Sequence, residues 1–138
     1  MPTIPSADAR RTETPNAVMT TLASPTQGPA GQAVWRVDAK PGMEGPVHAF
    51  DSELIWTWID GSATVTLERD RFTVGPGDTM ILPADVTRQM SADPRDGFAA
   101  IVVAPVGARV YNPDGTSDPD ACDIAPKGTE RTVPPWAR

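Results

Sequence analysis

The chain has 138 residues and a net charge of −6, which makes nucleic acid and anionic membrane surfaces poor candidates for its partners. Its 16 prolines and 11 glycines interrupt any long helical pattern and favour short strands joined by turns. The single cysteine, Cys122, excludes an internal disulfide. No apolar run approaches the roughly 20 residues of a membrane span, and the N-terminal stretch lacks an apolar signal core, so we expect a cytoplasmic protein.

The first part of the chain predicts one clear strand. Residues 1–31 are rich in proline and scattered charges, and we expect them to form an N-terminal arm. Within this range, residues 16–23 form either a first strand or a docked part of the arm. Residues 33–38 alternate between apolar and charged side chains, with Trp35 on the apolar face, which is typical of a half-buried strand.

Residues 53–59 give the clearest strand signal. The period of two divides them into one face with Glu53, Ile55, Thr57 and Ile59 and another with Leu54, Trp56 and Trp58. Both faces are largely apolar, which a strand with water on one side does not need. We therefore predict that Trp56 and Trp58 face outwards and form a homodimer interface, the alternative being that the terminal arms of the same chain cover them.

The remaining strands are short and regularly spaced, which predicts a β-sandwich or a small barrel with its core in residues 32–105. They are expected at residues 63–67, 72–74, 79–82, 87–91 and 98–104. Residues 106–138 carry many prolines and aspartates and predict an extended tail that wraps a surface. Trp136 is the expected anchor of this tail, because an aromatic side chain in a polar segment usually docks.

Two stretches of the chain resemble the paired motifs of the cupin superfamily, and the resemblance spans about residues 34–103. The first stretch has the glycines, the histidine and the carboxylate of the first motif, at Gly42, His48, Glu53 and Gly61. The second has Gly77 and Pro83, but Asp85 stands where the family has glycine and Arg88 stands where it has a histidine. The resemblance implies an all-β fold, an antiparallel jelly-roll β-barrel with its site inside the mouth, and often a dimer.

The same resemblance predicts which residues occupy the metal-ligand positions of the family. Position by position, these are His48, Phe50, Glu53 and Arg88. A phenyl ring donates no lone pair, and a guanidinium group stays protonated and repels a cation. Since two ligands are too few for zinc or non-haem iron, we expect no cofactor, the alternative being a transition metal at His48 and Glu53.

If the barrel closes as the family implies, His48, Glu53 and Arg88 point into one pocket and are the predicted catalytic residues. His48 would act as a general acid or base, and Arg88 would pair with Glu53 or bind an anionic oxygen of the substrate. A purely structural Arg88–Glu53 ion pair in place of the metal is the alternative. The predicted walls of the substrate pocket are Phe50, Ile55, Thr57, Met80 and Met90.

We therefore predict a metal-independent cupin that acts on a small organic molecule by non-redox acid–base chemistry, as a cyclase or isomerase of the kind found in secondary metabolism. One alternative is a noncatalytic barrel that binds or senses a small acid through Arg88. A second is a metal-dependent oxygenase with an incomplete ligand set. The expected partners are a small-molecule ligand and a second copy of the chain.

Overall fold

The computed structural model describes residues 3–115 and 126–138, so Cys122 lies outside the described residues. Over these residues the chain is built from antiparallel strands and two single-turn helices, η1 (Ser6–Asp8) and η2 (Pro135–Ala137). The strands are β1 (Arg10–Glu13), β2 (Ala17–Ala23), β3 (Gln32–Ala39), β4 (Ala49–Phe50), β5 (Leu54–Gly61), β6 (Ala63–Leu67), β7 (Asp70–Val74), β8 (Thr79–Leu82), β9 (Arg88–Ala92), β10 (Phe98–Pro105), β11 (Val110–Tyr111) and β12 (Arg131–Thr132).

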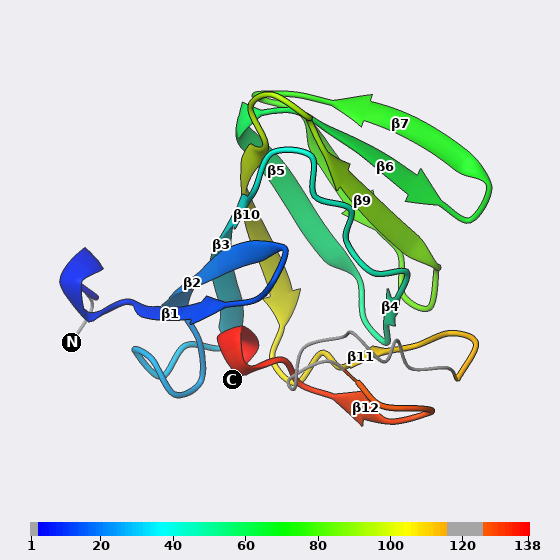
Figure 1. The fold of residues 1–138 in the computed structure, drawn as a ribbon. Helices are drawn as coiled ribbons and strands as arrows, with labels where there is room; N and C mark the ends of the chain where they lie inside the picture. Colours follow the sequence, from blue (N-terminus) through cyan, green and yellow to red (C-terminus); the bar gives the residue numbers. More distant parts are fainter. Residues whose placement is uncertain (1–2, 116–125) are drawn as a thin grey trace.

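The strands form two layers, as Figure 1 shows. The first layer is a six-stranded sheet in the order β1-β2-β3-β10-β5-β8. The second layer contains two three-stranded sheets, β12-β11-β4 and β7-β6-β9. Two isolated backbone bridges, His48 with Arg88 and Glu44 with Ser91, connect β9 to the segment that leads into β4. The chain passes repeatedly from one layer to the other, as in the predicted antiparallel jelly-roll barrel, so this prediction is confirmed.

The core lies between the two layers and follows the alternation of the strands. The fully buried side chains on the inner faces include Trp35, Leu54, Trp58, Val65, Leu82 and Val102. These residues come from both layers, so their burial holds the layers together and supplies the main apolar stabilisation.

Strand β5 faces the opposite way from the prediction. Trp56 and Trp58 are 9% and 0% exposed, whereas Ile55 and Ile59 are 38% and 44% exposed. The period of two identified which residues share a face, but with both faces apolar it could not identify the inner one. The larger indole side chains fill the core, so the predicted interface through Trp56 and Trp58 is wrong.

Part of the predicted N-terminal arm belongs to the first sheet. Strand β2 pairs with β3 along its length, and its inward residues Ala17, Met19 and Thr21 are buried. Of the two possibilities for residues 16–23, the structure therefore has the strand. The alternation of residues 17–21 between the two faces accounts for this.

The C-terminal segment docks on the first sheet. Helix η2 contacts β1, β2 and β3, and the side chain of Trp136 packs against the hydrophobic core. The hydroxyl group of Thr21 donates a 2.8 Å hydrogen bond to the carbonyl oxygen of Trp136. These contacts confirm Trp136 as the anchor of the tail. No helix in the described part of the chain is long and apolar enough to cross a membrane.

Two glycines with positive φ test the packing of the turns. Gly61 (φ +67°) lies so close to the carbonyl oxygen of Gly97 that an added Cβ would collide with it, whereas Gly77 (φ +90°) has open space. We expect Gly77→Ala to cost about 1 kcal/mol of unfolding free energy through backbone strain alone, and Gly61→Ala to cost more than about 3 kcal/mol. Urea denaturation of the two variants measures the difference, and equal costs would contradict the close approach of Gly61 to Gly97.

Candidate functional site

The two stretches that resemble the cupin motifs meet through their backbones. The backbone N–H of His48 donates to the carbonyl oxygen of Arg88 at 3.1 Å, and that of Arg88 donates to the carbonyl oxygen of His48 at 2.9 Å. Two residues that exchange both hydrogen bonds place their side chains on the same side of the sheet. Arg88 is buried on the barrel side, and His48 is half-buried with its Nδ1 atom shielded from solvent, so the structure brings His48 and Arg88 together as predicted.

Arg88 is a buried cation. Its side chain is 2% exposed, and its guanidinium carbon lies 4.4 Å from the centroid of the Phe50 ring, within the range of a cation–π interaction. Burial lowers the pKa of Arg88 to about 9, so the group keeps its charge at neutral pH. Among residues 3–115 and 126–138 its buried Nε has no hydrogen-bond partner, and no ion pair involves its side chain.

His48 lies beside Arg88 as an uncharged base. Its ring centroid is 5.9 Å from that of Phe50 in an edge-on arrangement, and its buried Nδ1 has no partner in the described part of the chain. Burial, together with the charge of Arg88, lowers the pKa of His48 to about 3. The imidazole is therefore neutral at pH 7 and can accept a proton or a hydrogen bond from a molecule bound beside it.

Glu53 does not join these two residues. It is exposed, lies immediately before β5, and makes no ion pair with Arg88. Leu54, the next residue, is the one that points inwards. The predicted clustering of Glu53 with His48 and Arg88 is wrong, because a shift of one residue along a strand moves a side chain to the other face.

The same reversal of β5 corrects the predicted pocket walls. Ile55 is exposed, and the hydroxyl group of Thr57 hydrogen-bonds that of Thr79 at 2.9 Å on the outer face, so neither lines the interior. Phe50 is buried, and Met80 and Met90 pack against the core, as predicted.

Trp56 and Trp58 are the interior residues that sequence reasoning missed. Their indole Nε1 atoms are buried without a hydrogen-bond partner among the described residues. From the sequence alone we predict that both tryptophans lie on the outer face of β5. The signal in the sequence that favours the inner face is the apolar area of the indole side chains, which is larger than that of the isoleucines on the other face.

The donor set does not fit a transition-metal ion. Of the four ligand positions implied by the resemblance, His48 alone places a metal-binding atom inside the barrel, since Glu53 is outside and Phe50 and Arg88 cannot bind a cation. No group of three or more His, Cys, Asp or Glu residues that could hold a metal ion occurs in the described ranges. The metal-dependent oxygenase is therefore the reading that these residues support least.

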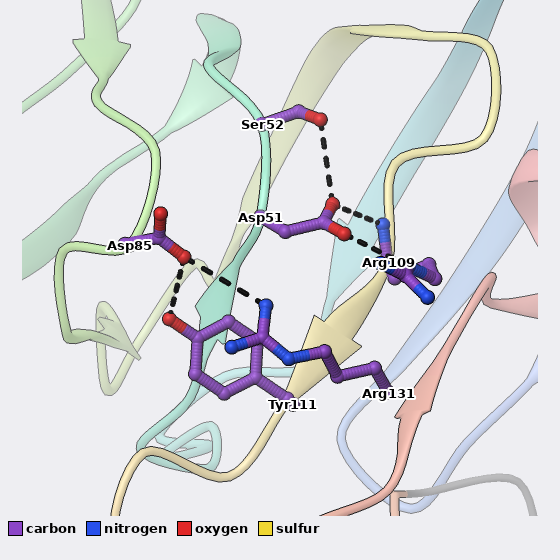
Figure 2. Close-up of polar contacts among 6 residues, drawn as sticks. All are labelled: Asp51, Ser52, Asp85, Arg109, Tyr111 and Arg131. Atoms are coloured by element: carbon purple, nitrogen blue, oxygen red, sulfur yellow. Dashed lines mark hydrogen bonds and ion pairs between the residues drawn. The ribbon is translucent and has the colours of Figure 1, made fainter.

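A polar cluster next to β4 holds the barrel end in place, as Figure 2 shows. The carboxylate of Asp51 accepts hydrogen bonds from the backbone N–H of Arg109 at 2.8 Å, from its Nε at 2.9 Å and from the hydroxyl group of Ser52 at 3.3 Å. Partial burial opposes the charge of Asp51, but these hydrogen bonds prevail and lower its pKa. Asp51 is thus committed to tying β4 to the segment before β11.

Asp85 makes a second tie in the same region (Figure 2). The hydroxyl group of Tyr111 donates to its carboxylate at 2.7 Å, and the guanidinium group of Arg131 lies 3.9 Å from the same carboxylate oxygen and stacks over the Tyr111 ring. Asp85 has φ +62°, a conformation that suits the glycine of the family motif and that aspartate also tolerates. The carboxylate thereby links the turn before β9 to β11 and β12.

The pKa of His48 predicts an acid-sensitive fold. The folded protein takes up this proton only near pH 3 and the unfolded chain near pH 6.5, so below pH 6.5 the unfolded state binds more protons. Stability should fall by about 1.4 kcal/mol per pH unit as the pH decreases from 6.5, and His48→Gln should remove this slope. Because His48 is the only histidine, its Hε1 NMR resonance reports the titration directly. A midpoint near pH 6.5 in the folded protein would contradict the burial described above.

Comparisons with known proteins agree with this fold. Residues 38–122, more than half of the chain, match the family model described as the AraC-like ligand binding domain. A search of curated protein sequences gives no significant match. The solved structures that resemble the chain include the polyketide cyclase RemF from Streptomyces resistomycificus (18% identity, 88% of this chain and 89% of that chain, TM-score 0.71).

Two other similar structures are parts of longer chains. They are the DMSP lyase DddQ from Ruegeria pomeroyi DSS-3 (18% identity, 81% of this chain and 64% of that chain, TM-score 0.70) and the oxalate decarboxylase of Bacillus subtilis (21% identity, 75% of this chain and 29% of that chain, TM-score 0.65). At these identities the likeness shows the cupin fold alone. Together with the family match, it establishes that the chain belongs to the family of AraC-like ligand binding domains, which have the cupin fold.

Proposed function

We propose that the chain is a metal-independent cupin that binds a small organic molecule inside its barrel and acts on it by non-redox acid–base chemistry. The observation that carries the proposal is a pair of adjacent groups, the neutral imidazole of His48 and the cationic guanidinium of Arg88, whose buried Nδ1 and Nε atoms have no hydrogen-bond partner among the described residues. A buried charge without a partner is costly, which supports a role in holding an anionic ligand. The description of the family as ligand binding domains supports a small-molecule ligand.

The proposed step is a proton transfer next to a carbonyl group. His48 accepts a proton from the carbon, the C–H electron pair forms a carbon–carbon double bond, and the C=O π pair moves onto the oxygen of the resulting enolate, which Arg88 stabilises. Where a second double bond is conjugated with the carbonyl group, return of the proton to the far carbon of that bond completes an isomerisation. In a cyclisation, the enolate carbon attacks a second carbonyl group of the same molecule, and the new alkoxide takes the proton.

The ligand itself would make His48 a better base. The charge of Arg88 is one of the causes that lower the pKa of His48 in the free protein. Burial is the larger cause and stays, but an anion bound to Arg88 offsets the second cause and so raises the pKa of His48 relative to the free protein. The similarity to a polyketide cyclase is one of fold, and it makes cyclisation one reaction to test among several.

A noncatalytic binding barrel is the second candidate, and a specific observation favours it. A histidine with a pKa of about 3 is a weak base, and with Glu53 on the outside no carboxylate of the described residues forms a hydrogen bond or an ion pair with it. In this candidate function, Arg88 binds the acid and His48 supplies a hydrogen bond.

Proton exchange on phenylpyruvate separates the two candidates. This probe carries a carboxylate for Arg88, exchangeable protons on C3 and an apolar ring. We expect the wild-type protein to increase the rate of C3 exchange with D₂O about 100-fold over His48→Gln, measured by NMR, because positioned acid–base groups contribute accelerations of this order.

Asp70→Asn, an exposed change on β7, is the matched control and should leave the rate unchanged. Calorimetry gives the binding constant of the same probe. Binding to the wild-type protein without any acceleration of exchange would contradict the acid–base step and favour the noncatalytic barrel.

We also propose a homodimer, now through the outer face of the first sheet in place of Trp56 and Trp58. Ile55 and Ile81 are paired neighbours on β5 and β8, and both are exposed, with Ile81 at 59%. We expect a dimer at micromolar concentration that Ile81→Glu converts to a monomer, while Phe72→Glu on β7 has no such effect. Analytical ultracentrifugation measures this, and a monomeric wild-type protein would contradict the proposal.

A further inference from the structure

Two indole N–H groups lie on the inner face of β5. The rings of Trp56 and Trp58 stack with centroids 5.6 Å apart and an interplanar angle of 29°, and Phe98 packs edge-on against both. The Nε1 atoms of both tryptophans are buried, and in the described ranges neither has a hydrogen-bond partner.

This arrangement is costly in a folded core. The indole nitrogen can only donate a hydrogen bond, and a buried donor without an acceptor destabilises the fold. A tryptophan in a protein interior is normally placed where its N–H finds an acceptor. Two adjacent exceptions on one strand therefore point to an acceptor that residues 3–115 and 126–138 do not supply.

The charged and polar groups around the interior also indicate a ligand that accepts hydrogen bonds. Arg88 contributes a cation with donor groups, and His48 is neutral. Asp51 and Asp85 are bound to Arg109 and Tyr111, and Glu53 is exposed. The inward-facing polar atoms without a partner in the described residues are thus mainly hydrogen-bond donors, so a complementary ligand is rich in acceptors.

Arg88 and the indoles come from opposite layers of the barrel. Arg88 begins β9 in the second layer, whereas Trp56 and Trp58 lie on β5 in the first. A molecule that reaches both needs two separate oxygen groups. The aromatic side chains of Phe50 and Phe98 suit an apolar body between them.

We propose that Trp56 and Trp58 form an oxygen-recognition subsite, and that the ligand is an organic acid whose carboxylate or enolate binds Arg88 and whose second, uncharged carbonyl oxygen accepts from the indoles. This inference rests on the proposed function, because it names the class of ligand that the same interior takes.

Matched pairs of acids test the subsite by calorimetry. The first pair is 4-acetylbenzoate and 4-isopropylbenzoate, which have the same number of heavy atoms and differ in the carbonyl oxygen. The second pair, 6-acetyl-2-naphthoate and 6-isopropyl-2-naphthoate, covers a longer span. For at least one pair we expect the acetyl compound to bind about five- to tenfold more tightly, the effect of one or two net hydrogen bonds.

Trp56→Phe and Trp58→Phe remove the N–H groups and keep an aromatic ring. Each should reduce the preference for the acetyl compound to less than about twofold, whereas Trp136→Phe in the C-terminal helix should leave it intact. Arg88→Met should weaken both members of a pair alike. If the wild-type protein shows no preference within either pair, or binds none of the four acids, the inference is wrong.

Indole NMR resonances give a test that needs no variant with a changed core. The chain has four tryptophans, and we expect the ¹H–¹⁵N resonances of two of them to shift with the acetyl compounds and not with the isopropyl compounds. Unchanged indole resonances in the presence of a bound acetyl compound would overturn the subsite.

The binding preference for acetyl compounds and the proton exchange on phenylpyruvate test the two proposals independently. A preference for acetyl compounds without proton exchange would support the subsite in a noncatalytic barrel. Exchange without that preference would support the acid–base proposal and refute the subsite.

Discussion

The pair of backbone hydrogen bonds between His48 and Arg88 is the contact on which the second layer and the site both depend. It is one of two isolated bridges between β9 and the segment that leads into β4, and it lies where the sheets β12-β11-β4 and β7-β6-β9 meet. The same two bonds fix the register that turns both side chains into the barrel. The ties from Asp51 to Arg109 and from Asp85 to Tyr111 hold the adjoining segments in place. The connection within the second layer and the position of the two site residues thus both depend on the pair of hydrogen bonds between His48 and Arg88.

The sequence predicted much of this arrangement. Short strands punctuated by proline and glycine predicted an all-β fold, and the two motif-like stretches predicted that His48 and Arg88 meet. These signals succeed because turn residues and motif spacing constrain the backbone locally. The glycine position of the second motif is instructive, since Asp85 adopts the positive φ that a glycine would and adds a hydrogen bond to Tyr111.

The facing of β5 could not be predicted, for a physical reason. Alternation assigns residues to faces, but which face is buried depends on the polarity difference between them, and here both faces are apolar. Glu53 stands one residue before the strand, where the spacing of the motif alone does not distinguish it from the inward position of Leu54. The wrong inner face of β5 explains three errors in the prediction: the homodimer surface, two of the pocket walls and the carboxylate partner of Arg88. For residues 16–23 the sequence allows both a strand and a docked arm, because the pairing of β2 with β3 is a long-range contact that local patterns do not fix.

The sign of the charge inside the barrel is opposite to that of the protein as a whole. The chain carries a net charge of −6, whereas the buried ionised group beside His48 is the cation Arg88. An anion approaching from solution therefore meets a repulsive field within about 10 Å of the surface, the Debye length at 0.1 M salt, and attraction only once it has entered. Added salt weakens the outer repulsion more than the sheltered inner contact. The association of an acidic ligand should thus speed up with ionic strength, while its residence inside the barrel changes little.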